Sequence, residues 1–193
     1  MARPKEFNPD EALEKAMRAF WAHGYHDTSM RDLVKATGVN QYGLYSTFED
    51  KHGLFLAALD RYRATVTPRI SRELSESSSG VKAIRRAFDR ILEITRQTEG
   101  HSGCLMCITA VEVAPYDKQA SSKVSGHLLH LRDAFQIAIE RGQAEGEISA
   151  DKDARTLAEF LTNNVYCVAV MMRAGAEIAY ARRHIDTALS ALL

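Results

Sequence analysis

Apolar residues recur at helical spacing along almost the whole chain, and this pattern constrains the fold more than any other sequence feature. Leu13, Met17 and Phe20 illustrate it near the N-terminus. No stretch shows the alternation and β-branched enrichment of a strand. No internal repeat with a period of 20–50 residues is present. We therefore predict an all-α protein of about nine helices.

Capping residues and helix breakers divide the pattern into segments. Pro68 is expected to kink or end the fourth helix, and the Ser-rich stretch 75–80 is expected to form a surface loop. The expected helices span about 9–23, 29–37, 41–48, 51–67, 81–98, 104–114, 118–145, 151–173 and 177–193.

Composition narrows the class of protein. The 193 residues carry 25 basic and 25 acidic side chains, so the formal net charge is zero. Nucleic-acid-binding proteins are often basic, so any positive surface here must be local. No apolar run approaches the roughly 20 residues that cross a bilayer, and the N-terminus lacks the apolar segment of a signal peptide. We therefore expect a cytoplasmic protein.

Residues 28–48 form the pattern of a helix-turn-helix, with a capped short helix, a glycine and a second short helix. Gly38 permits the positive φ that a tight turn between crossed helices needs. The first helix, with Phe20 and Trp21, is placed to cover the pair. A unit of this size fits the major groove of DNA. On spacing alone, an arbitrary helical hairpin is an equal alternative.

The residues of the run Gly24–Phe55 resemble the TetR family of bacterial repressors. They share a Gly-aromatic and Thr-Ser opening, Gly-Val at the turn, and Leu-Tyr-x-x-Phe-x-x-Lys-x-x-Leu over residues 44–54. The likeness covers roughly residues 8–60. It implies an all-α homodimer with a DNA-binding domain, here 1–52, and an effector-binding and dimerisation domain, here 53–193.

Two positions depart from the family pattern. Thr47 stands where the family often has His, and a threonine hydroxyl still donates to a phosphate. His52 stands where Glu is common, and Gly53 follows it. Because glycine early in a helix costs about 1 kcal/mol relative to alanine, we expect a soft junction between the two domains.

The DNA-contacting residues are expected at and around the second helix of the motif. Amide side chains pair bidentately with adenine, so the start of that helix is the candidate for base contacts. Hydroxyls and cations nearby are candidates for phosphate contacts. A short basic arm is expected to reach the minor groove or the backbone, unless it is only a frayed tail. The full set is Arg3, Lys5, Thr28, Ser29, Asn40, Gln41, Tyr42, Gly43, Tyr45, Thr47 and Lys51.

The C-terminal helices are expected to enclose a mainly apolar effector, with no cofactor and no metal. The expected lining is Phe55, Leu59, Phe88, Leu92, Met106, Cys107, Ala110, Leu131, Phe135, Tyr166 and Met171. The candidates for additional polar contacts are His127, His130, Asn163 and Asn164. Glu112 lies in an apolar helix, as its exposed edge or as a buried acid with a partner.

Cys104 and Cys107 form a C-x-x-C pair. Cys104 is expected in the first turn of a helix, where the helix dipole lowers the pKa of a thiol. Cys107 then lies one turn further on, placed as a resolving thiol. The alternative is that both are small buried hydrophobes. Zinc is not expected, because His101 and the two cysteines supply three ligands and a structural site needs four.

We predict a ligand-responsive transcriptional regulator, a repressor released from a palindromic operator by a mainly apolar small molecule. The helices over 151–173 and 177–193 are expected to form a dimer through a four-helix bundle. One alternative is a redox or electrophile switch at Cys104. A thiol oxidoreductase is the alternative from another class, and a helical adaptor without DNA affinity is a third. No catalytic constellation is recognisable, so no enzymatic activity is expected.

Overall fold

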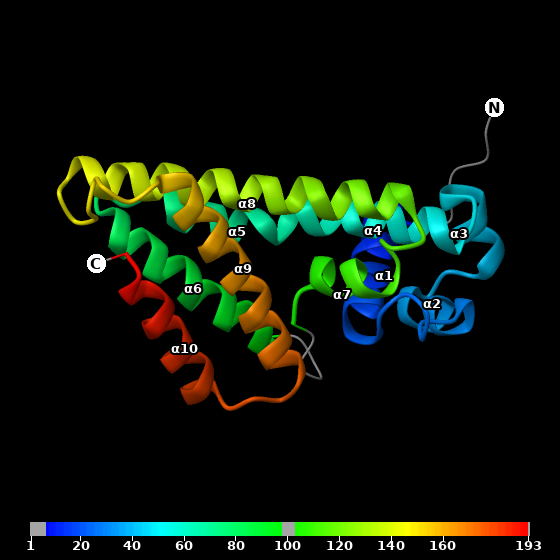
Figure 1. The fold of residues 1–193 in the computed structure, drawn as a ribbon. Coiled ribbons are helices and arrows are strands. Elements are labelled where there is room, and N and C mark those ends of the chain that lie inside the picture. The colour runs from blue at the N-terminus through cyan, green and yellow to red at the C-terminus, as the bar shows by residue number, and fades with distance from the viewer. Residues whose placement is uncertain (1–6, 98–102, 193) are drawn as a thin grey trace.

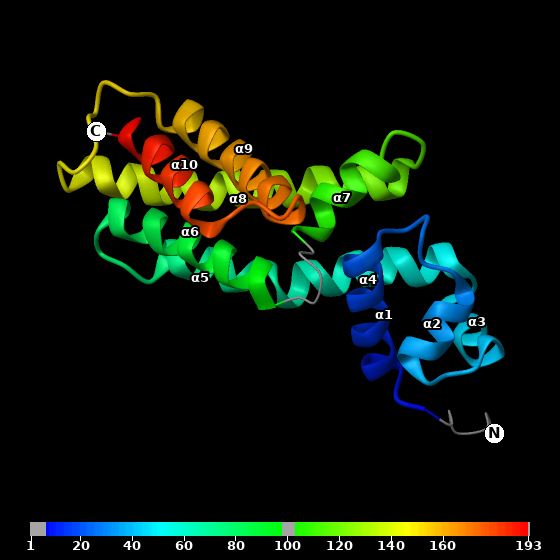
Figure 2. The same cartoon turned by 90° about the horizontal axis from the view of Figure 1, so that it is seen from below.

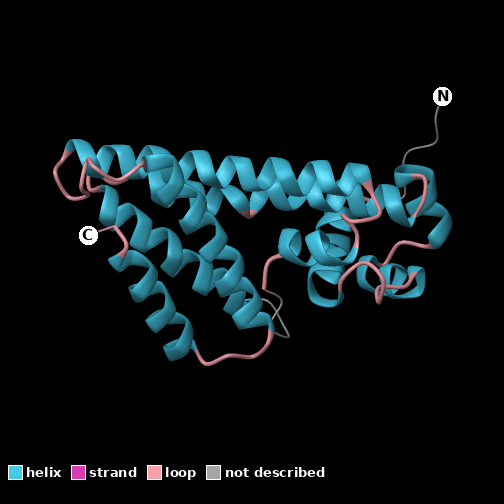
Figure 3. Ribbon diagram, viewed as in Figure 1, coloured by secondary structure: helices cyan, strands magenta, loops and turns pink. Residues whose placement is uncertain are grey.

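A computed structural model describes residues 7–97 and 103–192, and within those ranges all regular structure is α-helical (Figure 3). The prediction of an all-α fold is confirmed. The helices are α1 (Pro9–His23), α2 (Met30–Thr37), α3 (Gln41–Phe48), α4 (Lys51–Thr65), α5 (Thr67–Ser75), α6 (Gly80–Gln97), α7 (Leu105–Glu112), α8 (Lys118–Ala144), α9 (Ala154–Arg173) and α10 (Ile178–Ser190). None of these described helices has the length and apolarity to cross a bilayer.

Helices α1, α2 and α3 form a tri-helical unit at one end of the molecule (Figure 1). Asn8 caps α1 by accepting the Asp10 N–H at 3.0 Å, and Pro9 occupies the first turn. Phe20 is fully buried and its ring lies 5.1 Å from that of Phe55 in α4. The core of the tri-helical unit is therefore continuous with α4.

The break between α4 and α5 lies at Val66, two residues before Pro68. Proline has no N–H to donate and is tolerated in the first turn of a helix, where Pro68 is found. The expected kink or end is therefore present. The chain then continues as α5, a helix that the apolar pattern had not separated from its neighbours.

The remaining helices form a larger unit around α8 (Figure 2). Helices α5 and α6 pack against each other, α8 and α9 cross, and α10 packs on α9 and α6. The short α7 lies between α1 and this larger unit and contacts α4, α8 and α9 as well (Figures 1 and 2). α4 and α7 are therefore both in contact with the tri-helical unit and with the larger unit.

Candidate functional site

The helix-turn-helix is built from hydrogen bonds between residues close in sequence. Ser29 and Asp32 form a reciprocal capping box at the start of α2. Gly38 ends α2 in the left-handed region, with φ of 74°, and its N–H donates to the Val34 carbonyl at 2.9 Å. Asn40 then caps α3 by accepting the Gly43 N–H at 2.8 Å. The turn therefore follows directly from cap and glycine chemistry.

The start of α3 presents its polar residues to solvent. Tyr42 is 84 % exposed, and Asn40 and Gln41 are exposed beside it. Leu44, on the opposite side of the helix, is buried in the core. The geometry is compatible with a helix that inserts its N-terminal residues into a groove.

Two residues of the expected DNA-contacting set are oriented differently from the expectation. Thr28 is fully buried and its hydroxyl donates to the Gly24 carbonyl at 2.6 Å. The hydroxyl oxygen of Thr47 is shielded from solvent and has no hydrogen-bond partner among the described residues. Both placements argue against phosphate contacts from these hydroxyls.

Gly43 was expected to allow the backbone to approach DNA closely. A Cβ at this position would lie 2.9 Å from the Val39 side chain and 3.2 Å from the Phe7 ring. A side chain at this position is therefore already excluded by contacts within the protein, and the close approach of Gly43 to DNA stays a prediction.

Lys51, at the start of α4, lies over the ring of Tyr25, with 4.4 Å between its ammonium and the ring centroid. Partial burial lowers the pKa of Lys51 below its ordinary value. Tyr25 was not among the expected site residues, although it precedes the motif directly. Its ring also packs against Phe55 at 4.7 Å. Tyr45 is half-buried and Ser29 is exposed, while Arg3 and Lys5 lie outside the described residues.

The junction at His52 and Gly53 is tightly packed, contrary to the expected softness. The His52 Nε2 contacts the Oδ2 of Asp117, the residue that caps α8. Hydrogen bonds from the backbone N–H of Ala120 and from His52 hold the pKa of Asp117 below its ordinary value. A Cβ on Gly53 would lie 2.2 Å from the Phe48 carbonyl, so close packing requires glycine here.

Glu112 is an acid with a partner, which decides the alternative left open by the sequence. Its carboxylate accepts the Tyr25 N–H at 2.9 Å, and its carbonyl lies 3.2 Å from the His26 Nε2. A Cβ on Gly24 would lie 2.4 Å from the same carboxylate, and Gly24 has a positive φ of 85°. The last residue of α7 therefore holds the turn between α1 and α2.

Most residues expected to line an effector pocket belong to the close-packed core. Ala110, Tyr166 and Met171 are half-buried, and Cys107 lines a cavity between α7 and α9. Of the polar candidates, His127 is buried, His130 and Asn163 are exposed, and Asn164 donates to the Phe160 carbonyl. The fully buried members are Phe55, Leu59, Phe88, Leu92, Met106, Leu131 and Phe135.

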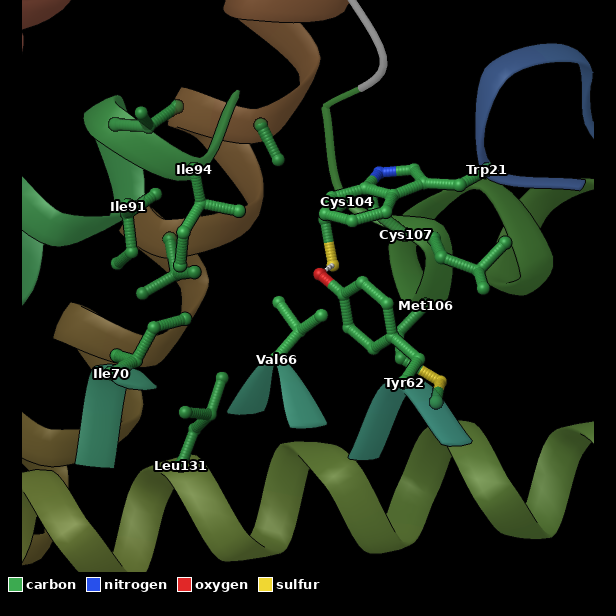
Figure 4. Packing of buried hydrophobic residues seen from close by; sticks show 14 of the residues in the cluster. Trp21, Tyr62, Val66, Ile70, Ile91, Ile94, Cys104, Met106, Cys107 and Leu131 are labelled. Atoms are coloured by element: carbon green, nitrogen blue, oxygen red, sulfur yellow. Dashed lines mark hydrogen bonds between the residues drawn. The ribbon is translucent and has the colours of Figure 1, made fainter. Parts of the chain in front are cut away.

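Several polar side chains lie inside this core, among them Tyr62 beside Cys104 (Figure 4). The Tyr62 hydroxyl donates to the Cys104 sulfur at 3.4 Å. The Thr67 hydroxyl lies 3.3 Å from the His127 Nδ1. Burial lowers the pKa of His127 to about 4. The buried hydroxyl oxygen of Tyr166 finds no hydrogen-bond partner among the described residues.

The cysteine pair does not have the expected acidity. Cys104 is the residue before α7, in extended conformation, and not in the first turn. Burial raises the pKa of the Cys104 thiol and outweighs the effect of nearby backbone N–H groups. Burial also raises the pKa of Cys107 to about 11. The helix-dipole argument from sequence was wrong in direction because it took no account of burial.

His101, the third candidate zinc ligand, lies outside the described residues. Within the ranges that the structure describes, no three His, Cys, Asp or Glu side chains are grouped to hold a metal ion.

Two family models match the chain. Residues 12–58 match a model described as bacterial regulatory proteins of the tetR family, and residues 80–188 match a tetracyclin repressor-like C-terminal domain. The second match alone covers more than half of the chain. The protein belongs to the TetR family. This family consists of transcriptional regulators and not of enzymes, so the thiol oxidoreductase interpretation is excluded.

Individual TetR-family relatives match over most of the chain. The transcriptional repressor ComR of Escherichia coli K12 is 36 % identical over 178 residues, covering 91 % of this chain and 84 % of ComR. The regulator YezE of Bacillus subtilis 168 is 28 % identical over the full length of both chains. A solved structure of a CifR cysteine mutant with a 26-base-pair operator DNA superposes with a TM-score of 0.85. It is 25 % identical, and the match covers 99 % of this chain and 100 % of that one.

Proposed function

We propose that this TetR-family protein is a dimeric repressor that is released from a palindromic operator by a small molecule. The exposed start of α3, with Asn40, Gln41 and Tyr42 outside and Leu44 inside, carries the proposal. The repressor ComR and the operator complex of CifR support it by similarity. Each protomer inserts α3 into a major groove, and two half-sites lie about one helical turn apart.

Ser29, Tyr45 and Lys51 are the proposed phosphate contacts, together with the basic arm at Arg3 and Lys5. Their role is to set the position of α3, because phosphate contacts fix register without reading sequence. Thr28 and Thr47 are left out of this set since their hydroxyls are buried.

The proposed dimer interface is formed by α9 and α10. One face of α9 carries the exposed stripe Phe160, Asn163, Cys167 and Val170, spaced three and four residues apart. Phe160 is 42 % and Val170 is 55 % exposed. A stripe with this spacing is suited to packing against the same helix of a second copy.

A small-molecule effector is favoured over a switch at Cys104 as the releasing signal. The thiolate is the reactive form of cysteine, and burial raises the pKa of both Cys104 and Cys107. The effector acts by binding one conformation of the dimer more tightly than the other.

A gel shift on the DNA flanking the gene, with excess unrelated DNA, tests the proposal. Tyr42→Ala is expected to weaken specific binding by roughly tenfold or more, as loss of a base contact costs about 1–3 kcal/mol. Ile137→Ala is the control, because Ile137 is 61 % exposed and lies on α8. The gel shift is repeated in reductant and in oxidant. DNA binding that is unaffected by the oxidant favours release by a small-molecule effector, whereas loss of binding in the oxidant favours a thiol switch. Absence of any specific shift contradicts the repressor function.

A further inference from the structure

A cavity of about 180 Å³ lies between α7 and the C-terminal half of α9. Its apolar wall is formed by Ile108 and Val111 of α7 and by Ala169 and Val170 of α9. An apolar protein cavity of roughly 150 Å³ is known to accommodate benzene. The space is therefore suited to a molecule with one ring, or an aliphatic body of the same size.

The polar part of the lining is one cation, one acid and the two thiols of the C-x-x-C pair. Arg173, near the end of α9, brings a guanidinium group to the cavity. Its positive charge stabilises the thiolate of Cys107, so its field reaches the cavity. A guanidinium group presents a planar fork of donors that matches a carboxylate.

The same cavity is joined to the DNA-binding unit by direct hydrogen bonds. Glu112 lines the cavity and accepts the Tyr25 N–H at 2.9 Å. The ring of Tyr25 in turn supports Lys51, the proposed phosphate contact. On the other side, the Arg173 Nη1 lies 3.5 Å from the Trp21 carbonyl of α1. A ligand that moves either charged side chain therefore acts on α1 and on the turn before α2.

We propose that this cavity binds a small carboxylate with an apolar body of single-ring size. The carboxylate lies at Arg173 and the apolar body lies against the four aliphatic side chains of α7 and α9. This inference rests on the proposed function, because it assigns the effector class and the effector site of that repressor. An anion in the cavity repels the carboxylate of Glu112, and this repulsion weakens its bond to Tyr25 and lowers affinity for DNA.

Calorimetric titration of the full-length protein with benzoate, without DNA, tests the site by itself. Benzyl alcohol is the uncharged probe of similar size. Benzoate is expected to bind roughly tenfold or more tightly than benzyl alcohol. Arg173→Gln is expected to remove that difference, because the guanidinium group that pairs with the carboxylate is lost. No binding of benzoate at millimolar concentration, or equal binding of the two probes, overturns the proposal.

Two tryptophan variants test where benzoate binds. Val111→Trp fills the cavity from an exposed position, since Val111 is 75 % exposed, and is expected to abolish benzoate binding. Ile137→Trp, at an exposed position of α8, is the matched control and is expected to bind benzoate as the wild type does. In the wild type, benzoate should slow alkylation of Cys107, whose side chain lines the cavity. Unchanged binding by Val111→Trp, or unchanged labelling of Cys107, contradicts this location.

Glu112→Gln tests the link to DNA. Glutamine keeps an acceptor for the Tyr25 N–H and removes the charge that repels the ligand. This variant is expected to bind operator DNA and benzoate, while benzoate no longer weakens its DNA binding. A wild-type protein that binds benzoate but not DNA contradicts the proposed function and leaves the cavity assignment standing. A wild-type protein whose DNA binding ignores bound benzoate contradicts the effector role of this cavity.

Discussion

The DNA-binding unit and the C-terminal helices differ in the sequence separation of their hydrogen-bond partners. In the DNA-binding unit, the residues that cap helices bond to residues nearby in sequence, whereas the buried polar groups of the C-terminal helices bond to residues far along the chain. Ser29, Asn40 and Asp50 each cap a helix through a backbone N–H three residues later. In the interior, Tyr62 bonds to a residue 42 positions away, and Thr67 to one 60 positions away.

This difference has an energetic consequence. A cap is formed as soon as its own helix forms, so it is insensitive to distant changes. A buried hydroxyl or imidazole is satisfied only when several helices pack correctly, and it destabilises the fold when it is not. The buried hydrogen bonds of the C-terminal interior therefore depend more on correct helix packing than the caps of the DNA-binding unit do.

The largest effect on stability is expected from Phe20→Ala and Phe135→Ala, because both rings are fully buried in one continuous core. Each substitution is expected to lower the free energy of unfolding by about 3–5 kcal/mol. Phe20→Ala should also abolish DNA binding, whereas Phe135→Ala should retain it when folded. Urea unfolding followed by circular dichroism, with a gel shift, measures both. Two separate unfolding transitions would show that the units do not share a core.

The pH dependence of the free energy of unfolding tests the contribution of the buried His127. The unfolded chain takes up a proton near the ordinary pKa of 6.5, whereas the folded protein does not do so until about pH 4. Stability is therefore expected to fall by about 3 kcal/mol as the pH drops from 6.5 to 4. His127→Asn should flatten that dependence in urea unfolding. The exposed His130→Asn is the control, and equal flattening by both variants would refute the assignment.

Replacement of the helix cap at Asp50 tests the contribution of a hydrogen bond between residues close in sequence. The Asp50 carboxylate accepts the Gly53 N–H at 2.7 Å. Asp50→Ala is expected to lower the free energy of unfolding by about 1 kcal/mol, and Asp50→Ser to restore most of it. Thermal unfolding at several denaturant concentrations measures the difference. If serine does not rescue the alanine variant, the carboxylate acts by charge and not as a cap.

The smallest effects are expected from two tyrosines of the interior. Tyr166→Phe removes a buried hydroxyl that has no partner among the described residues, so stability should rise by about 1 kcal/mol. Tyr62→Phe removes the donor to the Cys104 sulfur, so stability should fall by about 1 kcal/mol. Chemical denaturation of both variants measures whether the free energy of unfolding rises or falls in each. A fall for Tyr166→Phe would mean that its hydroxyl is satisfied in solution.

The sequence by itself determined the helical class, the helix-turn-helix and all the helices except α5. Periodicity predicted the helical class, and Gly38, Asn40 and Pro68 marked turns and breaks that are present in the structure. These features were predictable because each depends on one or two side chains and on backbone atoms within about four residues.

Only the tertiary structure decided which chemistry those residues have. Packing buries Thr28, which was expected to be exposed. It also buries Cys104, so that the pKa of its thiol is raised where a lowered pKa was expected. It also joins Glu112 to Tyr25 across 87 positions and creates the cavity beside Arg173. Burial, pKa and cavities depend on which helices meet in space, and helical periodicity specifies a buried face without specifying what that face contacts.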